Sequence, residues 1–504
     1  MNSPVGMLLR MILFSLTTVL GVLGELGSSS AVGQQPIQLQ PQNPHYFLFR
    51  GKTVALITNG EHYGAVMNLD FDYHKYLATI QSDGLNYTRI FPGSYREVPG
   101  KSFGILRNDL APADGRFLAP WKRSATPGYA GGGNKFDLNQ WDPEYFRRFH
   151  DFLREASDRG IVVEISLFSS QYGEMQWELS ALNAKNNVNN LTDVDWKKVH
   201  TLENGNLLSV QERYTRQIVR EANESDNVIF EIQNEPFADR PVLAGVVNPY
   251  LFPPNREKFP NSIEVADELS LAWQTRVAQW ITSEEATLPN KHLIAQNYCD
   301  FGLPVKELIP GVSIVNFHYA FQQAAAVNYG LDKAIAYDET GFLGQKDDGY
   351  RRQAWNFMLS GGGAFDGLDY SFTVGHEDGT DTAPNGPGGG SPALRRQLGI
   401  LSRFLQQFPL AEMRPDNTAV KFAGGTHPRS LSSLNGQYAV YFDDNGPADV
   451  TLRLPGGEYF GEWLNTTTGI DTPLQPFVHG GGEKVLHSPD FQNGIAMRLI
   501  RRPE

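Results

Sequence analysis

Length, composition and charge place the chain among folded globular proteins. It has 504 residues, of which 40% are hydrophobic, 20% are charged and 12% are aromatic, and disordered or fibrous chains do not have this composition. The formal net charge is −13, and Lys and Arg are scattered singly along the chain. Nucleic acid is therefore not an expected partner, because its phosphates are bound by clusters of basic residues.

The amino-terminal segment 1–33 has the pattern of an export signal. Arg10 precedes an apolar run over 11–23, and the segment 31–33 (Ala-Val-Gly) places small side chains at the two positions that determine cleavage. A transmembrane anchor is the alternative, but the run is shorter than the ~20 residues that span a bilayer. We expect cleavage after Gly33, a secreted or periplasmic bacterial protein, and no stable membrane insertion of the mature chain.

A linker is expected over 34–45, because this stretch is rich in Gln and Pro and has no apolar period. Beyond it, short apolar runs rich in β-branched residues alternate with segments of helical spacing. The candidate strands are 54–58, 85–91, 161–168, 228–233, 292–296, 312–318, 333–338 and 364–372. The candidate helices are 71–82, 142–160, 207–222, 265–287, 350–359 and 394–408.

This alternation predicts an α/β fold. Apolar strands that alternate with helices are typical of a parallel sheet covered by helices. Eight of them favour a closed (β/α)8 TIM barrel over 46–412, rather than an open doubly wound sheet. No glycine-rich dinucleotide-binding motif follows the first strand, which also disfavours the open sheet. Over 413–504 the strands are short and Gly-rich turns separate them, which predicts a small antiparallel β-sandwich.

Two glutamates end strands of the predicted barrel, where the active sites of such barrels lie. The fourth strand leads into Asn234-Glu235-Pro236, and the seventh leads into Asp338-Glu339. Two carboxylates that face one cavity can break a glycosidic bond, because one protonates the leaving oxygen while the other attacks the anomeric carbon or activates water. We therefore predict that Glu235 and Glu339 are catalytic. Their separation, which decides between retention and inversion, cannot be obtained from the sequence.

Asn-Glu-Pro after an apolar strand, with a second strand-tip Glu 104 residues later, resembles clan A of the glycoside hydrolases, which includes the family 5 cellulases. The resemblance covers roughly residues 46–410. It implies that Glu235 is the acid/base, that Glu339 is the nucleophile of a retaining mechanism, and that Asn234 contacts the sugar 2-hydroxyl. The implied substrate is a β-linked oligo- or polysaccharide, and no cofactor is implied.

Other residues match the clan or depart from it. Arg89 resembles the arginine that ends the clan's second strand, and His318-Tyr319 resembles its His and Tyr after the sixth strand. The clan often ends its eighth strand with a sugar-stacking Trp, whereas this chain offers Tyr370 there. The segment 168–207 is also long for a third loop. Further expected sugar contacts are His62, at the tip of the first strand, and Asn297, next to the fifth, while Trp121 and Trp177 are candidates for stacking on sugars.

Two other functions remain open at this point. A barrel of this fold can bind polysaccharide without cleaving it, because fold does not prove activity. A metal-dependent hydrolase would use His62, His318, His376 and Asp378, although these lack the paired spacing typical of such sites. The sequence decides neither the sugar nor exo against endo action, and it leaves the oligomeric state open. Long loops around Gly131 and Gly388 are expected to narrow the cleft and so to favour short oligosaccharides.

Overall fold

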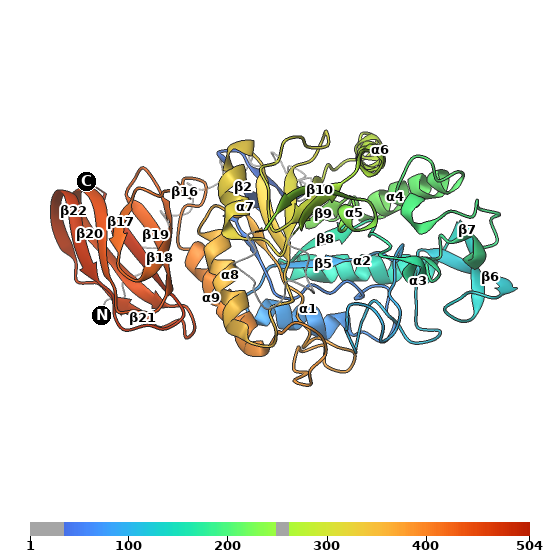
Figure 1. The fold of residues 1–504 in the computed structure, drawn as a ribbon, viewed down its shortest axis with the longest axis horizontal. Helices are drawn as coiled ribbons and strands as arrows, with labels where there is room; N and C mark the ends of the chain where they lie inside the picture. The colour runs from blue at the N-terminus through green and yellow to red at the C-terminus, as the bar shows by residue number, and fades with distance from the viewer. Residues whose placement is uncertain (1–34, 248–261, 504) are drawn as a thin grey trace, which may run out of the picture. The chain divides into compact units, whose positions relative to one another are not determined.

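The computed structural model describes residues 35–247 and 262–503, so the expected export signal over 1–33 lies outside the described residues. Eight parallel strands form one nearly closed sheet in the order β4-β15-β14-β13-β12-β9-β8-β5. Each overlaps one of the predicted strands, which confirms the (β/α)8 barrel (Figure 1). Their bounds are β4 Leu56–Ile57, β5 Tyr87–Ile90, β8 Val162–Ser166, β9 Val228–Glu231, β12 Leu293–Asp300, β13 Ile314–His318, β14 Ala334–Glu339 and β15 Ala364–Phe365.

Asn86 joins the first strand of the barrel to the second. Its side-chain amide donates to the backbone oxygen of Ala55 at 2.9 Å and accepts from the backbone N–H of Ile57 at 2.8 Å. Its own backbone N–H donates to the oxygen of Ile57 at 3.2 Å. The side chain thus supplies the hydrogen bonds that a β-ladder would otherwise make at this seam, and β4 and β5 are held side by side.

Helices follow the barrel strands and cover them (Figure 1). In α2, Asp142 caps the first turn by accepting from the backbone N–H of Glu144, Pro143 occupies the first position, and Gly160 follows the end with φ of 71°. These are the start and stop signals from which this helix was predicted. The helices are α1 Tyr73–Ser82, α2 Pro143–Asp158, α3 Glu174–Trp177, α4 Leu207–Ala222, α5 Pro236–Asp239, α6 Glu268–Glu285, α7 Gln322–Asn328, α8 Asp347–Met358 and α9 Pro392–Leu405.

Residues 35–54 close the amino end of the barrel and are not a linker. Strands β1 (Gln38–Gln40), β2 (Asn43–Phe49) and β3 (Lys52–Val54) form an antiparallel sheet. Ile37 and Phe47 are fully buried and pack in one cluster with the first residues of several barrel strands. The expectation for 34–45 is corrected because a few apolar side chains among the Gln and Pro residues are enough to fill the barrel end.

Two hairpins extend the loops of the barrel. Strands β6 (Trp121–Pro127) and β7 (Asn134–Trp141) pair in the loop after the second strand, and β10 (Pro241–Val246) pairs with β11 (Ser262–Ala266) after the fourth. The helix predicted to begin at residue 265 therefore begins later, at Glu268, because the preceding residues are part of this second hairpin.

The C-terminal part is an antiparallel sheet in which the long strand β20 pairs with different strands along its two halves, as expected for a sandwich. The first half of β20 pairs with β17 and its second half pairs with β23. Trp463 and Met497 are among the side chains buried in the core of this part. The strands are β16 Arg414–Pro415, β17 Val420–Ala423, β18 Thr426–Ser432, β19 Gln437–Asp444, β20 Asp449–Asn465, β21 Asp471–Pro473, β22 Phe477–His487 and β23 Ile495–Arg501.

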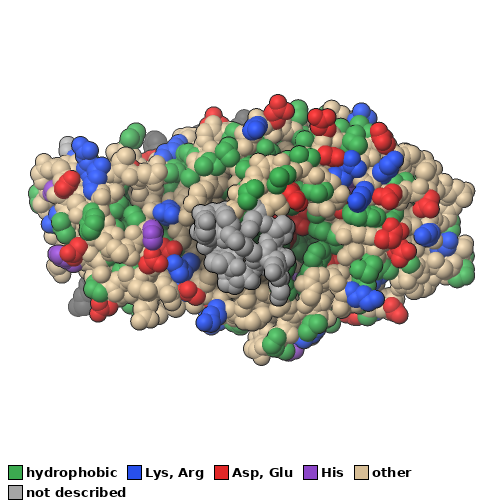
Figure 2. Space-filling model, viewed as in Figure 1, with side chains coloured by type: hydrophobic (Ala, Val, Ile, Leu, Met, Phe, Trp, Pro, Cys, Tyr) green, Lys and Arg blue, Asp and Glu red, His purple; other side chains and the backbone are tan. Residues whose placement is uncertain are grey.

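The surface carries charges of both signs. Figure 2 shows Lys and Arg side chains interspersed with Asp and Glu over the face in view, in keeping with the scattered basic residues of the sequence. Among the described residues, no helix combines the length and the apolar character needed to cross a membrane.

Candidate active site

Glu235 lies just beyond β9, on a backbone of unusual conformation. The chain after β9 runs beside the third strand's exit, where Asn234 N donates to the oxygen of Phe168 at 2.9 Å. Glu235 itself has φ of 45° and ψ of 53°, and Pro236 begins α5 immediately after it. Non-glycine residues rarely adopt this left-handed conformation, and those that do are concentrated at functional sites.

Glu339 is the last residue of β14, and three donors face its carboxylate. The hydroxyl of Tyr319 donates to Oε1 and that of Tyr63 donates to Oε2. Arg89 Nη1 lies 3.4 Å from the same Oε2. Donors around a carboxylate stabilise its ionised form, so the contacts with Arg89 and Tyr319 offset part of the rise in pKa that burial causes.

His318, the last residue of β13, joins the two glutamates. Its Nδ1 atom lies 2.9 Å from Glu235 Oε1 and 3.7 Å from Glu339 Oε1. Because both oxygens approach the same nitrogen atom, the distance between them cannot exceed the sum of these two distances. The side chains of Glu235 and Glu339 retain 13% and 8% of their exposure. The structure therefore brings the two predicted carboxylates to one rim of the barrel, within reach of one sugar ring.

The protonation of these three groups is coupled. Burial lowers the pKa of His318, but the negative charges of Glu339 and Asp338 and the hydrogen bonds to Asp338 and Glu235 outweigh burial and raise it well above its ordinary value. Burial raises the pKa of Glu339, and the charge of Glu235 adds to this effect. Burial also acts to raise the pKa of Glu235, but hydrogen bonds from His318 and Tyr172 outweigh it and lower that pKa. A protonated imidazole therefore lies between the two carboxyl groups.

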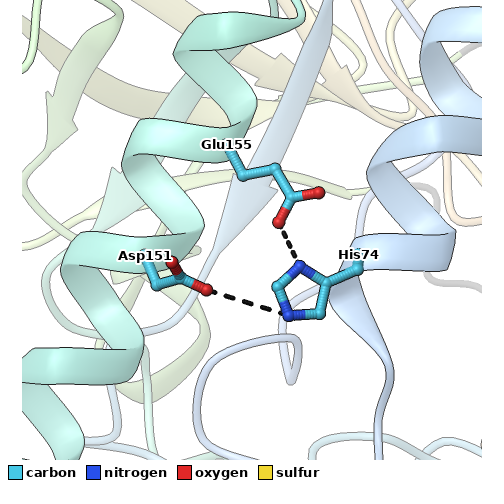
Figure 3. A group of neighbouring side chains, drawn as sticks. All are labelled: His74, Asp151 and Glu155. Carbon is cyan, nitrogen blue, oxygen red and sulfur yellow. Dashed lines mark hydrogen bonds and ion pairs between the residues drawn. The ribbon is translucent and has the colours of Figure 1, made fainter.

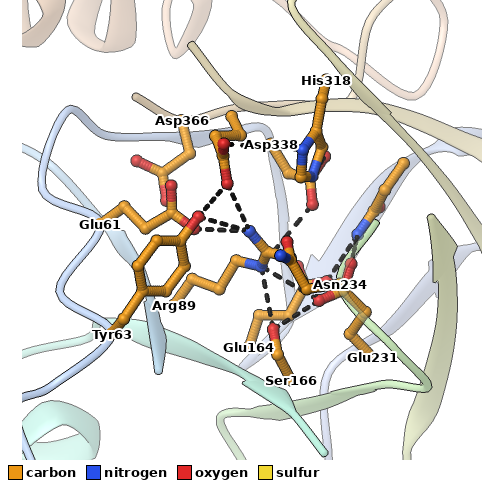
Figure 4. A network of polar contacts seen from close by, with 12 residues as sticks. Glu61, Tyr63, Arg89, Glu164, Ser166, Glu231, Asn234, His318, Asp338 and Asp366 are labelled. Carbon is orange, nitrogen blue, oxygen red and sulfur yellow. Dashed lines mark hydrogen bonds and ion pairs between the residues drawn. The ribbon is translucent and has the colours of Figure 1, made fainter. Parts of the chain in front are cut away.

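Arg89 lies beneath the two glutamates and has no exposed surface. Figure 4 shows its guanidinium between Glu61 on one side and Glu231 and Asn234 on the other. Nη1 lies 2.5 Å from Glu61 Oε1, while Nη2 lies 2.5 Å from Glu231 Oε2 and 2.7 Å from Asn234 Oδ1. Since it also faces Glu339, Arg89 holds the nucleophile candidate and Asn234 in place. It was expected to contact sugar, but a fully buried side chain acts through its neighbours.

The barrel interior below Arg89 is rich in buried carboxyl groups. Burial raises the pKa of Glu164 to about 8, and the neighbouring charge of Glu231 adds to this effect. Burial likewise raises the pKa of Glu61 and of Asp366 well above the ordinary value. These groups lie around a single guanidinium (Figure 4). The raised pKa values have this cause, because one cation cannot balance so many buried anions.

His318 belongs to two clusters of side chains whose atoms lie close enough together to share a metal ion. One is Glu231, His318 and Asp338, and the other is Glu235, Asp300 and His318. In the first, Arg89 already pairs with Glu231 and lies 3.7 Å from Asp338. A metal ion there would lie beside a guanidinium, so charge repulsion disfavours it.

The third such group lies on the outer face of α1 and α2. Figure 3 shows His74 with its two ring nitrogens facing Glu155 and Asp151. Asp151 also pairs with Arg154, and Glu155 pairs with Arg159 at 2.7 Å. Both carboxylates thus have cationic partners from their own helix. This cluster ties α1 to α2.

The histidines considered for a metal-dependent hydrolase do not gather. His62 lies 3.0 Å from Asp109, whereas His318 lies between the two glutamates. His376 is exposed, and Asp378 pairs with Lys75 on α1 at 3.1 Å. Among the described residues, no group of side chains that could share a metal ion contains more than one of these four candidates.

The other expected sugar contacts have different surroundings. His62 is buried and stacks on Phe71 with ring centroids 4.3 Å apart, and burial lowers its pKa to about 3. Asn297 is buried, and its side-chain amide has no hydrogen-bond partner among the described residues. Tyr370 lines a cavity together with Glu61 and Tyr63. His62 lines the same cavity, so two of these three residues, His62 and Tyr370, share a cavity with Tyr63, a partner of Glu339.

Neither candidate tryptophan is available to stack on a sugar. Trp121 is 1% exposed and packs on Trp141 and Tyr214. Trp177 is 2% exposed, and its Nε1 donates to the oxygen of Val194 at 2.9 Å. Both are core residues of the long loops, so the expectation of stacking is wrong for both.

Tyr172 contacts Glu235 and was not found from the sequence. Its hydroxyl donates to Glu235 Oε2 at 2.6 Å and accepts from Asn234 Nδ2 at 2.7 Å. Asp239, at the end of α5, accepts from the backbone N–H groups of Gln171 and Tyr172 at 2.8 Å each. The long third loop, noted in the sequence only for its length, therefore delivers a hydroxyl to the acid/base candidate.

Comparison with known proteins gives matches in structure alone. No protein-family model and no curated protein matches the sequence. A glycoside hydrolase family 5 structure from Bacteroides vulgatus ATCC 8482 matches with a TM-score of 0.61 and 12% identity, covering 92% of this chain and 94% of that one. The fold is that of this hydrolase. A second structure, named glycoside hydrolase, matches with a TM-score of 0.60 and 13% identity over 93% and 97% of the two chains. The first match confirms the resemblance to the family 5 barrel at the level of the fold, and the second shows the same fold in another glycoside hydrolase.

Proposed function

We propose that this chain is a retaining glycoside hydrolase that cleaves a β-linked oligo- or polysaccharide. The observation that carries the proposal is the pair Glu235 and Glu339, whose facing oxygens lie 2.9 Å and 3.7 Å from the same nitrogen of His318. Carboxyl groups of retaining glycosidases lie about 5–5.5 Å apart, whereas inverting enzymes need about 6.5–9.5 Å to admit a water. If the two oxygens and the nitrogen lay on one straight line, the distance between the oxygens would only reach the lower end of the inverting range. Any appreciable bend brings the oxygens closer, which favours retention.

In the proposed first step, the proton of Glu235 moves to the glycosidic oxygen. The bond between that oxygen and the anomeric carbon breaks, and Glu339 forms a bond to the same carbon. In the second step, Glu235 takes a proton from water, the water oxygen attacks the anomeric carbon, and Glu339 is released as a carboxylate. Tyr63, Tyr319 and Arg89 hold Glu339 for attack, because each directs a donor at its carboxylate.

The first step requires a proton on Glu235 and an ionised Glu339. The pKa directions favour the reverse in the absence of substrate, with a raised pKa for Glu339 and a lowered one for Glu235. His318 Nδ1 is close to both carboxylates. We propose that it passes the proton from Glu339 to Glu235 as a sugar enters, leaving Glu339 to its three donors.

Trapping of the glycosyl-enzyme tests this proposal. A 2-deoxy-2-fluoro glycoside with a good leaving group slows the second step more than the first, so the covalent intermediate accumulates. We expect one glycosyl unit bound per chain, located on the peptide that contains Glu339. Glu339→Gln should remove the label, whereas Glu97→Gln should keep it, because Glu97 is a buried carboxyl that pairs with Asn108 and Tyr95. Labelling at any other carboxylate contradicts the assignment.

A non-catalytic carbohydrate-binding barrel is distinguished by a second assay. Glu339→Gly lacks the nucleophile but retains Glu235, so an enzyme would still transfer sugar from a glycosyl fluoride of inverted anomeric configuration. A binding protein would transfer nothing in either form. Turnover of the fluoride by the variant thus excludes the binding protein.

We also propose that the protein is exported. The support is the leader pattern of residues 1–33, and amino-terminal sequencing of the secreted or periplasmic protein should begin at Gln34; retention of Met1 would contradict cleavage. We propose 413–504 as a second domain after a barrel domain that ends at 412 and includes residues 35–54, because α9 ends at Leu405 and the first strand of the sandwich begins at Arg414.

A further inference from the structure

The loop that follows the eighth strand is joined to the loop that follows the second. The guanidinium of Arg107 lies 2.8 Å from Asp381 Oδ2, and it also donates to the backbone oxygen of Ala383 at 2.9 Å. Asn385 accepts from Arg107 N at 2.5 Å and donates to its backbone oxygen at 2.9 Å. Leu106 N adds a backbone hydrogen bond to Asn385 at 2.8 Å. Two loops far apart in sequence thus form one continuous barrier.

The same loop is also joined to the loop after the seventh strand, which begins just beyond Glu339. Gln345 Nε2 donates to the oxygen of Gly386 at 3.1 Å, and Gly344 N donates to the oxygen of Pro387 at 3.2 Å. Gly388 packs so tightly against the backbone of Gly341 and the ring of Tyr370 that a Cβ atom would not fit. The barrier therefore runs without a break from the seventh strand, past the eighth, to the second. We call it the loop wall, defined by residues 105–110, 341–345 and 381–389.

The space between the loop wall and Tyr63 is small. The cavity there has a volume of about 60 Å³, and Glu61, Tyr63, Tyr370 and Asn385 are among its lining residues. Tyr63 is also the residue that donates to Glu339 Oε2. Pockets that take small organic ligands have volumes of roughly 300–1,000 Å³. This cavity, which Tyr63 joins to Glu339, is therefore too small to hold a second sugar ring.

The contacts of the two glutamates indicate which part of the substrate lies on this side. Glu339 bonds to the anomeric carbon of the glycone, while Glu235 protonates the oxygen that leaves with the aglycone. Tyr63 joins Glu339 to the cavity at the loop wall, whereas Tyr172 joins Glu235 to the third loop. A glycone longer than one sugar would therefore extend toward the loop wall, which limits its length.

We infer that the enzyme is exo-acting and releases single sugars from the non-reducing end of its substrate. This inference rests on the proposed function and adds to it the class of substrate: chains or glycosides with an accessible terminal sugar. It assigns Arg107 and Asn385 as specificity-determining residues, although their hydrogen bonds within the described residues go to the loop wall and to Tyr370, and not to Glu235 or Glu339.

The test compares glycones of different length on the purified full-length protein. The probes are a set of 4-nitrophenyl β-monosaccharides, the corresponding β-disaccharides, and reducing-end-labelled oligosaccharides of the sugar that reacts. We expect hydrolysis of a monosaccharide glycoside, at least about tenfold lower kcat/KM for direct release of the nitrophenyl group from the disaccharide, and release of monosaccharide alone from the oligosaccharide at the earliest times. The labelled product should shorten by one sugar at a time.

Opening the wall supplies the matched comparison. Arg107→Ala removes the ion pair with Asp381 and should raise the disaccharide-to-monosaccharide ratio of kcat/KM about tenfold. Arg116→Ala is the control and should leave the ratio unchanged. Arg116 is in the same loop as Arg107 but outside the wall, and it pairs with Asp70 at 2.6 Å. Midpoints of thermal unfolding show whether each variant is folded.

The outcomes separate this inference from the function on which it rests. Internal cleavage by the wild-type enzyme, with mixed oligosaccharides from the first time point, overturns exo action while leaving the glycosidase intact. An unchanged ratio in folded Arg107→Ala overturns the role of the wall. No hydrolysis of any glycoside, together with no covalent labelling of Glu339, overturns the proposed function and the inference together.

Discussion

Replacing Arg89 by Leu should destabilise the whole barrel. The side chain has no exposure, and its guanidinium pairs with Glu61, Glu231, Asp338 and Glu339. Removing one partner of a buried ion pair leaves the other charge without compensation, which typically costs about 3–5 kcal/mol of the free energy of unfolding. Because several carboxylates lose the same cation, we expect a loss at the upper end of this range.

The loss should depend on pH in a defined direction. The charge of Arg89 lowers the pKa values of Glu61 and Glu339, which burial raises, so without Arg89 these two values in the folded state rise further above their unfolded values. The folded variant then binds protons that the unfolded chain releases, so its stability falls as pH rises through the interval between those values. The difference between wild type and Arg89→Leu should therefore be larger at pH 8 than at pH 5.

Urea denaturation at pH 5 and pH 8 measures both effects, with tryptophan fluorescence as the signal. Arg147→Leu is the control, because Arg147 forms an exposed pair with Glu144 on α2, and exposed pairs contribute little to stability. Equal denaturation midpoints for Arg89→Leu and wild type at pH 8 would refute the claim that this guanidinium compensates the buried carboxylates.

Three further predictions concern single groups. Tyr172→Phe removes a hydrogen bond that lowers the pKa of Glu235, so the basic limb of the pH profile of kcat/KM should move to higher pH. Tyr95 lies nearby without contacting Glu235, so Tyr95→Phe should leave the basic limb where it is. Glu164 has a pKa raised to about 8 in the folded state, so the free energy of unfolding of the wild type should fall between about pH 5 and 8. Glu164→Gln should make this fall with pH less steep in urea titrations. An unchanged slope would show that Glu164 does not cause the fall. Asn86→Ala removes the side-chain bonds between β4 and β5 and should lower the free energy of unfolding by about 1–3 kcal/mol, measured in the same way.

The sequence predicted those parts of the fold that depend on local pattern. The eight barrel strands were found because each is apolar on both faces and short, and the helix caps around α2 were found because Asp142, Pro143 and Gly160 carry the start and stop signals themselves. The tips of the strands could be placed for the same reason. In a closed parallel barrel, all strands deliver their last residues to one rim, so two strand-tip glutamates 104 residues apart meet without any knowledge of the loops.

The parts that were missed depend on partners far away in the sequence. Trp121 became a core residue because Trp141 and Tyr214 lie against it, and Tyr172 reaches Glu235 because Asp239 holds its backbone. No periodicity records such contacts, since loop residues follow neither a helical nor a strand repeat.

The catalytic chemistry of the site and its selectivity for substrate length therefore depend on different parts of the structure. The bond-breaking chemistry depends on strand ends, so it follows from the barrel once Glu235 and Glu339 are in place. The length of glycone that the site accepts depends on contacts between loops, such as that of Arg107 with Asp381. If this reasoning is correct, substitutions in the loop wall will change which chains are cleaved while labelling of Glu339 by a fluoroglycoside persists, and substitutions at the strand tips will abolish both.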